Sequence, residues 1–565
     1  MPNSIEREAN PRMKRSVNPT SHISNSGSDS HAGAAASRRR RTSESSQDFA
    51  PLHFGPNTLE GVMQVPADLL LRLKAFAEQE NRWADVEAEL RANMHRGIVV
   101  TTSFSGSGAY EAMMVQVLDE AARMLGTGTP CVKFYSATEV DPTARSALLQ
   151  HDIRSRPMHV FGDLLERLPK LARDQLQKTQ AEMLSLWEMS KLEHASGNIG
   201  AADLSLEHSR LAKKWVEYMH DVVVDVDFQE TAYCYVHKGQ CPLSPKVCGE
   251  FSQHLWYEVA GSTCVAFASP GKNAHWLHES ALVFYCWLYS SRYFDPHAII
   301  HECVGAFPAE IFDGVLNGDI GKQLKCISSA PTLESDEGGL WEIVSFLFSP
   351  EDLGVPIARR RRYTLCLRAM RTMGIDFRSA FFSTLHVTAQ VFTEAIHDWP
   401  VGSLPQTNGD MARLEGYQVE AHKLGFCSAH FDDWKIDFLV VNIAQREEYM
   451  NLAAIKRREP ILPTLLKTSI LFDLIADQEV PVCVHWVAQG FPHPSFFKSS
   501  CAVRKYFPFP HLVRQRQRTQ SSKEPGADTG LLLSDKAQRN LTGNAMHWAQ
   551  AAASLVYVLG CTRIL

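Results

Sequence analysis

The sequence lacks the features that would place the chain in a membrane or on a secretory route. None of its apolar runs is long enough to cross a bilayer, and the apolar segment Ala281–Tyr289 is far too short. Residues 1–30 are polar and rich in Ser and Asn, which argues against a secretory signal. The 13 cysteines are scattered and odd in number, so we expect reduced thiols in an intracellular protein.

A strong charge of either sign is also missing. The net charge is -6, which neither supports nor excludes a nucleic-acid partner, because only the surface that meets phosphate must be basic. Hydrophobic residues make up 45% of the chain and charged residues 21%, which predicts a mostly globular protein. Its 565 residues are enough for a sizeable core and for more than one structural unit.

The composition of the first 55 residues differs from that of the chain that follows. Residues 1–55 contain few apolar side chains and are predicted to form a disordered arm rich in Ser and Arg. The run Arg38–Arg41 within it fits a nuclear import signal or a phosphate-binding tail, and plain solvated charge explains it equally well. Residues 56–96 have helical spacing and are expected to form a helical lead-in.

Short apolar strands then alternate with helices across residues 97–370, with an insert at 170–250 that begins with two polar helices. Strands are expected at residues 98–100, 132–136, 159–161, 259–266, 298–301 and 340–347. This alternation predicts an α/β fold, a doubly wound and mostly parallel Rossmann-like sheet that binds ligands at the carboxyl ends of its strands.

The remaining chain is less regular. Residues 371–480 have no clear periodicity, and residues 481–565 end in a helix-like stretch. Before that helix, residues 504–530 are basic at first and then rich in Pro, Gly and Ser, which predicts a loop. Its Arg514, Arg516 and Arg518 fit either phosphate contacts or a solvated loop.

Three expected strand ends carry residue types that bind a nucleoside cofactor. Residues 104–108 (Phe-Ser-Gly-Ser-Gly) follow the first strand and open a helix, where glycine lets a ligand approach the backbone. Glu139 ends the second strand and can bind both ribose hydroxyls, and Asp163 after the third can accept a hydrogen bond from an adenine amino group. Either acid alone fits an ordinary loop, but together they favour a cofactor cleft. The spacing does not separate a methyl donor from a dinucleotide.

A reactive residue type follows the fourth expected strand. Residues 261–272 (Gly-Ser-Thr-Cys-Val-Ala-Phe-Ala-Ser-Pro-Gly-Lys) place Cys264 in a loop, and the next strand ends in residues 301–304 (His-Glu-Cys-Val). Taken alone, Cys264 fits a buried structural thiol, which is the commoner fate of an intracellular cysteine.

With these segments the sequence resembles the cytosine-5 DNA methyltransferases. That family carries a Pro-Cys-Gln-x-Phe-Ser loop and then a Glu-Asn-Val strand end, and its opening Phe-x-Gly-x-Gly turn matches residues 104–108. Further matches follow in the family's order over about residues 97–560. They are Gly354–Arg361 (Gly-Val-Pro-Gln-x-Arg-x-Arg in the family), Gln489–Pro492 (Gln-Gly-Phe-Pro) and Leu541–Ala545 (the closing Gly-Asn motif).

The resemblance implies a class I methyltransferase fold that uses S-adenosylmethionine and acts on DNA in the nucleus. It makes residues 371–480 the target-recognition region and residues 481–565 the return to the catalytic domain. The resemblance implies that Cys264 is the nucleophile and that Glu302 stabilises a proton on the base. It also implies that Arg359 and Arg361 bind the carbonyl oxygen of the base or a phosphate. The implied cofactor contacts are Phe104, Gly106, Ser107, Gly108, Glu139, Asp163, Thr263 and Asn544.

Several positions depart from the family pattern while the Cys, the Glu and the Arg pair remain. The altered positions are Thr102 (for an acid), Ala109 (for Gly), Thr263 (for Pro), Val265 (for Gln), Ala268 (for Ser), Cys303 (for Asn) and Ile357 (for Gln). Three functions therefore stay open: methylation of DNA cytosine, methylation of RNA cytosine, and a catalytically weak relative that only binds DNA. The sequence does not indicate the oligomeric state.

A separate group of sulfur and nitrogen ligands lies in the insert. Cys234, His237, Cys241 and Cys248 are spaced C-x2-H-x3-C-x6-C, and four such ligands suit tetrahedral zinc. The spacing belongs to no familiar zinc finger, so packed or incidental thiols are the favoured interpretation, with a small zinc knuckle as the alternative.

Overall fold

The computed structural model describes residues 58–267, 275–318, 340–383, 392, 408–423, 439–444, 461–475, 477–493, 505–508 and 533–565. The expected arm at 1–55 with its run Arg38–Arg41 lies outside the described residues, and so do Arg514, Arg516 and Arg518 of the expected basic loop. No helix within the described part of the chain combines the length and the apolar character needed to cross a membrane.

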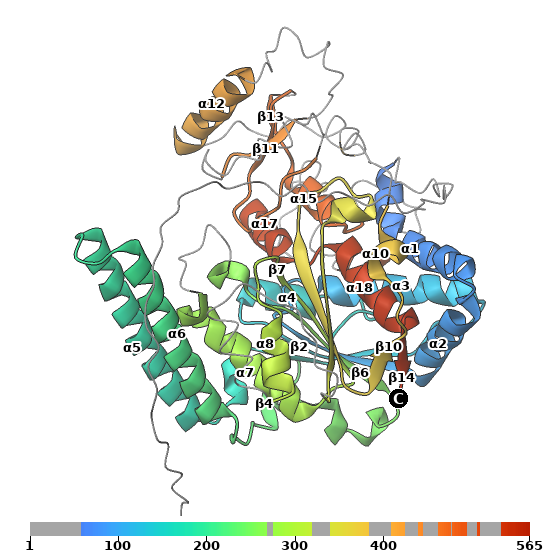
Figure 1. The fold of residues 1–565 in the computed structure, drawn as a ribbon. Helices are drawn as coiled ribbons and strands as arrows, with labels where there is room; N and C mark the ends of the chain where they lie inside the picture. Colours follow the sequence, from blue (N-terminus) through green and yellow to red (C-terminus); the bar gives the residue numbers. More distant parts are fainter. Residues whose placement is uncertain are drawn as a thin grey trace, which may run out of the picture. The chain divides into compact units, whose positions relative to one another are not determined.

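A seven-stranded sheet forms the centre of the described chain (Figure 1). Its strands are β1 (Ile98–Ser103), β2 (Val132–Thr138), β3 (His159–Phe161), β6 (Leu255–Gly261), β7 (Ala298–Val304), β8 (Glu342–Phe348) and β9 (Arg361–Leu367). They lie in the order β3-β2-β1-β6-β7-β9-β8. All pairs from β3 to β7 are parallel, and only β9 runs antiparallel to its neighbours β7 and β8. The prediction of an α/β, doubly wound and mostly parallel sheet is confirmed.

Two expectations about strands are corrected. The strand expected at 259–266 is β6, which ends at Gly261; its last pair is with Glu302, and Cys264–Ala266 form a short 3-10 turn instead. The sequence pattern did not predict β9, which follows the Arg-rich motif. Its residues are nearly all buried between β7 and β8, so they show no alternation that would mark a strand.

Two apolar layers cover the sheet (Figure 1). On one side, α1 (Leu59–Gln79), α2 (Trp83–Arg96), α3 (Ala109–Leu125) and the C-terminal α18 (Trp548–Gly560) pack together and share the larger core cluster. On the other side lie α7 (Glu279–Phe294) and α8 (Glu310–Leu316), with an aromatic-rich core. Every residue of α18 is buried, as expected for a helix that is apolar on all sides.

The direction of the strand order reverses between β1 and β6. In open parallel sheets, such a reversal opens a crevice at the carboxyl ends of the strands, where ligands bind. The glycine-rich turn after β1 and the Cys264 loop after β6 both begin at this crevice.

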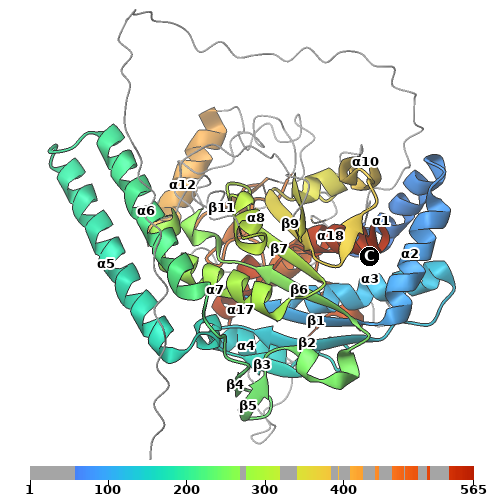
Figure 2. The ribbon, with the colours of Figure 1, turned by 60° about the horizontal axis from the view of Figure 1, so that its bottom comes forward.

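The insert contributes a helical pair and a hairpin. α5 (Lys170–Ala195) and α6 (Ala201–Val223) pack against each other, and β4 (Thr231–Cys234) pairs antiparallel with β5 (Gly239–Pro242). Figure 2 shows this hairpin beside β3, at the edge of the large sheet. It therefore lies next to the end of the sheet that carries Asp163.

The chain after β9 forms smaller units. β10 (Met370–Thr372) pairs with β14 (Thr562–Ile564), and a separate antiparallel sheet contains β11 (Val440–Asn442), β12 (Leu471–Asp473) and β13 (Gln478–Glu479). The other helices in this part of the chain include α10 (Phe377–Phe381), α12 (Asn408–Lys423), α15 (Val482–Ala488) and α17 (Asp535–Asn544).

Candidate functional site

The turn after β1 is shaped by backbone conformation. Phe104, Gly106 and Gly108 have positive φ values of 54°, 56° and 77°. A Cβ atom on Gly108 would lie 2.2 Å from Cε1 of His151, so this position needs glycine for its conformation and for its space. Ser107 is fully buried, and its carbonyl oxygen lies 2.7 Å from Nε2 of His151. Gly108 is the N-cap of α3, so the turn carries the free N–H groups of a helix start.

The two acids expected to bind the cofactor lie at neighbouring strand ends. Glu139 accepts a hydrogen bond from the Gly106 N–H at 2.8 Å and another from the Asp141 N–H at 2.8 Å, one on each carboxylate oxygen. Each oxygen keeps a second acceptor position, which suits the two hydroxyls of a ribose. Burial raises the pKa of Glu139. Asp163 follows β3, and its Oδ1 accepts from the Leu165 N–H at 2.9 Å.

The sequence did not point to Glu111, a buried acid beneath the glycine-rich turn. Thr102, which stands where the family has an acid, donates a hydrogen bond to Oε1 of Glu111 at 2.7 Å. The Thr102 hydroxyl also lies 2.8 Å from the Ser105 hydroxyl, so this carboxyl group is linked to the turn. Burial raises the pKa of Glu111 to about 7. An acid among the apolar residues of the first turns of α3 was the signal that could have identified it.

The C-terminal segment, with Asn544 as an expected cofactor contact, lies beside this turn through its backbone. A Cβ atom on Gly106 would lie 3.6 Å from the carbonyl oxygen of Asn544, while the side chain of Asn544 is exposed and donates to Asn540 at 3.2 Å. Gly543 is pressed against another segment, because a Cβ atom there would lie 2.1 Å from the backbone nitrogen of Lys467. These close approaches place the end of α17 beside the candidate cofactor site.

Beyond β6, the loop with Cys264 leaves the sheet next to an acid. A Cβ atom on Gly261 would lie 3.5 Å from Oε2 of Glu302, its partner on β7. The hydroxyl of Ser262 lies 2.7 Å from Nε2 of His301, which fixes the start of the loop. Thr263 is exposed, whereas Cys264 is half-buried and packs against the aromatic core. Cys264 is thus partly accessible as a residue rather than enclosed.

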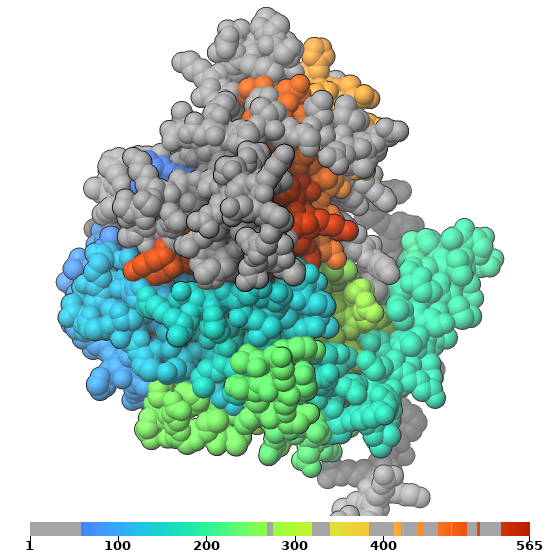
Figure 3. All heavy atoms as spheres, turned by 180° about the vertical axis from the view of Figure 1, so that it is seen from behind, coloured from blue at the N-terminus to red at the C-terminus, as the bar shows by residue number. Residues whose placement is uncertain are grey.

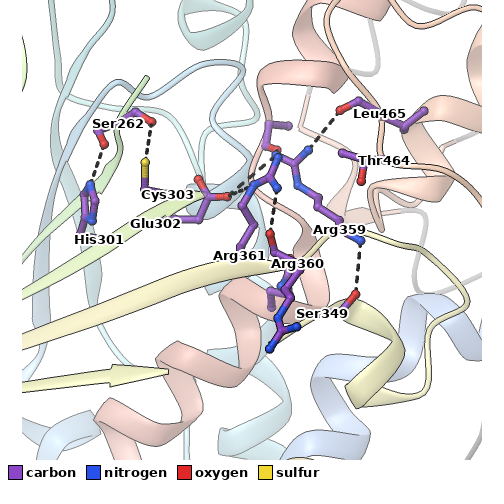
Figure 4. A network of polar contacts seen from close by, with 12 residues as sticks. Ser262, His301, Glu302, Cys303, Ser349, Arg359, Arg360, Arg361, Thr464 and Leu465 are labelled. Carbon is purple, nitrogen blue, oxygen red and sulfur yellow. Dashed lines mark hydrogen bonds and ion pairs between the residues drawn. The ribbon is translucent and has the colours of Figure 1, made fainter. Parts of the chain in front are cut away.

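Glu302, Arg359 and Arg361 form a buried charged cluster, which Figure 4 shows converging from β7 and from the chain that enters β9. Nε of Arg361 lies 3.1 Å from Oε1 of Glu302, and a guanidinium nitrogen of Arg359 lies 3.9 Å from the same oxygen. The three residues are only 7%, 4% and 9% exposed, respectively. One carboxylate between two guanidinium groups leaves an excess positive charge in a region of low dielectric, which suits a carbonyl oxygen or an anion.

The two arginines are held differently. Arg359 donates to the carbonyl oxygens of Leu465 at 3.2 Å and Ala545 at 2.9 Å, so two distant segments fix its position. Burial and the neighbouring charge of Arg361 lower the pKa of Arg359 to about 10. Among the described residues, Arg361 donates to the adjacent Arg360 carbonyl oxygen at 2.9 Å and forms its ion pair with Glu302. Both guanidinium groups therefore keep N–H donors for a ligand, and among the described residues the Nε of Arg359 has no hydrogen-bond partner.

The expected zinc ligands are only partly brought together. Cys234, His237 and Cys241 lie in one cluster, but the fourth member is His159 of β3 and not Cys248. Cys248 lies instead 3.8 Å from the hydroxyl of Tyr135, because the chain turns away after β5 through two short 3-10 turns. The structure thus brings three of the four predicted ligands together and leaves Cys248 apart from them.

The strand order with a single reversed strand, β9, is that of the Rossmann-like class I methyltransferase fold, and its crevice holds the glycine-rich turn and the buried charged cluster. No protein-family model matches the sequence, and no curated protein matches it.

Three solved structures are similar to the chain at low identity. A protein from an E. coli prophage, described as a DNA modification methyltransferase, has 11% identity and a TM-score of 0.36, over 82% of this chain and 99% of that one. The S. pombe Dnmt2 methyltransferase has 10% identity and a TM-score of 0.32, over 82% and 98%. The Entamoeba histolytica methyltransferase EhMeth has 10% identity and a TM-score of 0.35, over 82% and 98%. These scores are low, so the fold assignment rests on the strand order.

Proposed function

We propose that the protein transfers a methyl group from S-adenosylmethionine to carbon 5 of cytosine in DNA. The observation that carries the proposal is the buried cluster of Glu302, Arg359 and Arg361, which lies beside the start of the loop with Cys264. A cofactor-type turn with Glu139 occupies the same edge of the sheet. A nucleophile, a base-binding acid and two cations at one crevice fit base methylation better than a hydride transfer.

The cofactor contacts are part of the proposal. When bound, S-adenosylmethionine supplies a methyl group made electrophilic by its sulfonium. The turn at 104–108 would hold the amino-acid part through backbone N–H groups, Glu139 the ribose hydroxyls, and Asp163 the adenine amino group. Thr263 and Asn544 would border the same site.

Cys264 would act as the nucleophile that attacks the base. This step is needed because carbon 5 of cytosine reacts too weakly with a methyl donor by itself. The Cys264 thiolate adds to carbon 6, and the electron pair of the 5,6 double bond then makes carbon 5 electron-rich enough to take the methyl group. Loss of the proton from carbon 5 restores the double bond as the thiolate leaves. Half-burial of Cys264 agrees with this role, since a reactive thiol must be reachable.

Glu302 and the arginines would control the charge on the base. The Glu302 carboxyl group would stabilise a proton on ring nitrogen 3 while the thiolate adds. Arg361, held near by Glu302, would donate to the carbonyl oxygen on carbon 2, and Arg359 would keep the cluster in place. The target base must leave the duplex to reach this site, at a cost of roughly a few kcal/mol.

Transfer of labelled methyl from S-adenosylmethionine to matched DNA and RNA tests the proposal. Wild type is compared with Cys264→Ala and with Cys131→Ala, a control at an exposed cysteine remote from the loop. We expect label on DNA from wild type and from the control, and none from Cys264→Ala. Label on RNA alone would move the substrate to RNA. No label on either, from a folded chain that binds the cofactor, would leave a binding protein and overturn the proposal.

DNA with 5-fluorocytosine tests the covalent step directly. Fluorine at carbon 5 leaves no proton to remove after methyl transfer, so the thioether bond to carbon 6 should persist. We expect a denaturation-resistant adduct whose peptide contains Cys264. An adduct at another cysteine would contradict the assigned nucleophile.

Two wider assignments belong to the same proposal. We assign target recognition to residues 371–480, whose described part includes the small sheet β11-β12-β13.

We also propose that the protein is nuclear and that the run Arg38–Arg41 is its import signal. Replacing these four arginines with alanine in a fluorescently tagged chain should abolish nuclear accumulation, and unchanged accumulation would contradict the signal.

A further inference from the structure

Four nitrogen- and sulfur-bearing side chains meet where the insert touches the edge of the large sheet. They are His159 of β3 and Cys234, His237 and Cys241 of the β4–β5 hairpin, here called the His159 cluster. Their candidate ligand atoms all lie within 4.8 Å of one another. Both cysteines are buried, while His159 is half-buried and His237 is exposed.

Three separations within the His159 cluster match those of ligands around one metal ion. Nδ1 of His237 lies 3.4 Å from Sγ of Cys241 and 3.5 Å from Sγ of Cys234, and Nδ1 of His159 lies 3.8 Å from Sγ of Cys234. A tetrahedron with zinc–sulfur bonds of about 2.3 Å and zinc–nitrogen bonds of about 2.0–2.1 Å has edges of roughly 3.3–3.8 Å. We propose that the His159 cluster binds a structural zinc ion.

The hairpin is built to present its three ligands to one point. Cys234 and Gly239 form the last pair of β4 and β5, and Lys238 closes the turn with a φ of 54° while its N–H donates to the Cys234 carbonyl oxygen at 2.7 Å. His237 lies within this turn, and Cys241 follows on β5. All four positions of the tetrahedron would be filled by side chains, which is typical of structural rather than catalytic zinc.

Ordinary packing gives little support to the hairpin. The apolar cluster around it contains only five buried residues: Phe161, Ala232, Cys234, Cys241 and Leu243. Such a small core seldom fixes a two-stranded hairpin alone, and small units of this kind usually depend on a metal or a disulfide. A metal that joins β3 to the hairpin would supply the missing constraint and would also cover the edge of the sheet.

The position of the cluster connects it to the candidate cofactor site. Figure 3 shows the hairpin segment, in green, lying against the cyan and teal chain of the β2–β3 side. The Tyr235 N–H donates to the Val160 carbonyl oxygen at 2.7 Å, and a Cβ atom on Gly162 would lie 3.4 Å from the Tyr235 ring. Gly162 precedes Asp163. The zinc would therefore hold the hairpin against the strand end that is assigned to adenine, a consequence that rests on the proposed function.

Metal analysis of the purified full chain tests the assignment, with a pair of variants that separates the His159 cluster from the set suggested by sequence alone. We expect about one zinc per chain in wild type and in Cys248→Ser. We expect loss of zinc in Cys241→Ser and a marked loss in His159→Ala. Zinc absent from wild type, or lost in Cys248→Ser but kept in His159→Ala, would overturn the proposal. A disulfide between Cys234 and Cys241, found by mass under non-reducing conditions, would overturn it too.

Cobalt substitution in wild type keeps the test decisive if the cysteine variants do not fold. Co²⁺ exchanged into the intact chain should give strong tetrahedral ligand-field absorption and thiolate-to-cobalt charge-transfer bands. Weak octahedral absorption without thiolate bands would overturn the proposal. Since neither readout depends on methyl transfer, failure here would leave the proposed function standing, and failure of the activity test would leave the zinc site standing.

Discussion

The two halves of the large sheet prepare their strand ends by different physical means. At β1 to β3, the candidate cofactor side, backbone conformation shapes the site. Gly106 and Gly108 have positive φ values, and backbone N–H groups donate hydrogen bonds to the carboxylate of Glu139. At β6, β7 and β9, the candidate base side, buried charges dominate, with Glu302 between two arginines. One side therefore depends on conformation and space, and the other on ionised side chains.

The two sides also differ in how a missing group could be compensated. On the cofactor side an acid is missing at Thr102, yet Glu111 supplies a carboxyl group from the neighbouring helix. On the base side each charge needs its partner, because an unpaired buried charge is strongly destabilising. Removing Glu302 would therefore leave the two buried arginines without their shared carboxylate.

The largest expected effect is on the base side. Glu302→Gln keeps the shape but removes the charge between the two arginines, so we expect kcat to fall about 10²–10³-fold. Cofactor affinity should stay within about twofold, because the effect belongs to the transition state. Steady-state kinetics and calorimetry measure both, with Glu89→Gln at a surface ion pair as the control. An equal loss of cofactor binding would remove the distinction between the two sides.

Gly108→Ala tests the dependence on space on the cofactor side. We expect the free energy of unfolding to fall by about 2–4 kcal/mol, since the methyl group would meet His151 in addition to the backbone strain. Gly126→Ala is the matched control, because Gly126 also has a positive φ, of 63°, but no atom within 4 Å of the added Cβ. Urea denaturation should show about 1–2 kcal/mol for the control. Equal losses would mean that crowding by His151 contributes nothing.

Glu111→Gln tests the buried acid through the pH dependence of stability. Burial raises the pKa of Glu111 in the folded state to about 7, above the ordinary value of 4.5. Its contribution to stability is therefore complete below about pH 4.5 and is lost as the pH rises through 7. Wild type should therefore lose about 2 kcal/mol more than Glu111→Gln between about pH 5 and pH 8. His301 acts in the opposite direction, because burial lowers its pKa to about 3 and its contribution is lost as pH falls below about 6.5. Parallel stability curves for the two proteins would contradict the role of Glu111.

The smallest effect is expected for Glu139→Gln. The amide keeps one acceptor oxygen and loses the charge, so we expect cofactor affinity to fall about tenfold while kcat at saturating cofactor changes little. Calorimetric titration with S-adenosylmethionine measures the affinity, with Glu78→Gln at an exposed ion pair as the control. A large fall in kcat with unchanged cofactor affinity would contradict the assignment of Glu139 to cofactor binding.

Local patterns were sufficient to predict much of the fold and the main candidate residues. Apolar runs broken by turn residues predicted the α/β sheet, and a glycine-rich turn before an amphipathic helix placed residues 104–108 at a strand end. The roles of Cys264, Glu302 and the arginines came from short motifs in a fixed order, and they stay predictions. The strand at 259–266 was misplaced because the apolar character of Val265 to Phe267 continues after the chain has left the sheet.

Contacts between distant segments were beyond such patterns. Nothing near Cys234 in the sequence indicates His159 as its neighbour, since they meet only because the hairpin packs on the edge strand β3. In the same way, Arg359 is fixed by the carbonyl oxygen of Ala545, 186 positions away along the chain.

The sequence by itself determined the alternation of strands and helices, the glycines of the first turn and the residue types that could perform chemistry. These depend on side-chain periodicity and backbone freedom, which act over a few neighbouring residues. Only the tertiary structure showed that β9 is antiparallel to its neighbours and that Glu302 pairs with Arg361. It also showed that His159, and not Cys248, lies with Cys234, His237 and Cys241. Each of these depends on which surfaces pack together, and the packing is set by burial and charge pairing over the whole chain.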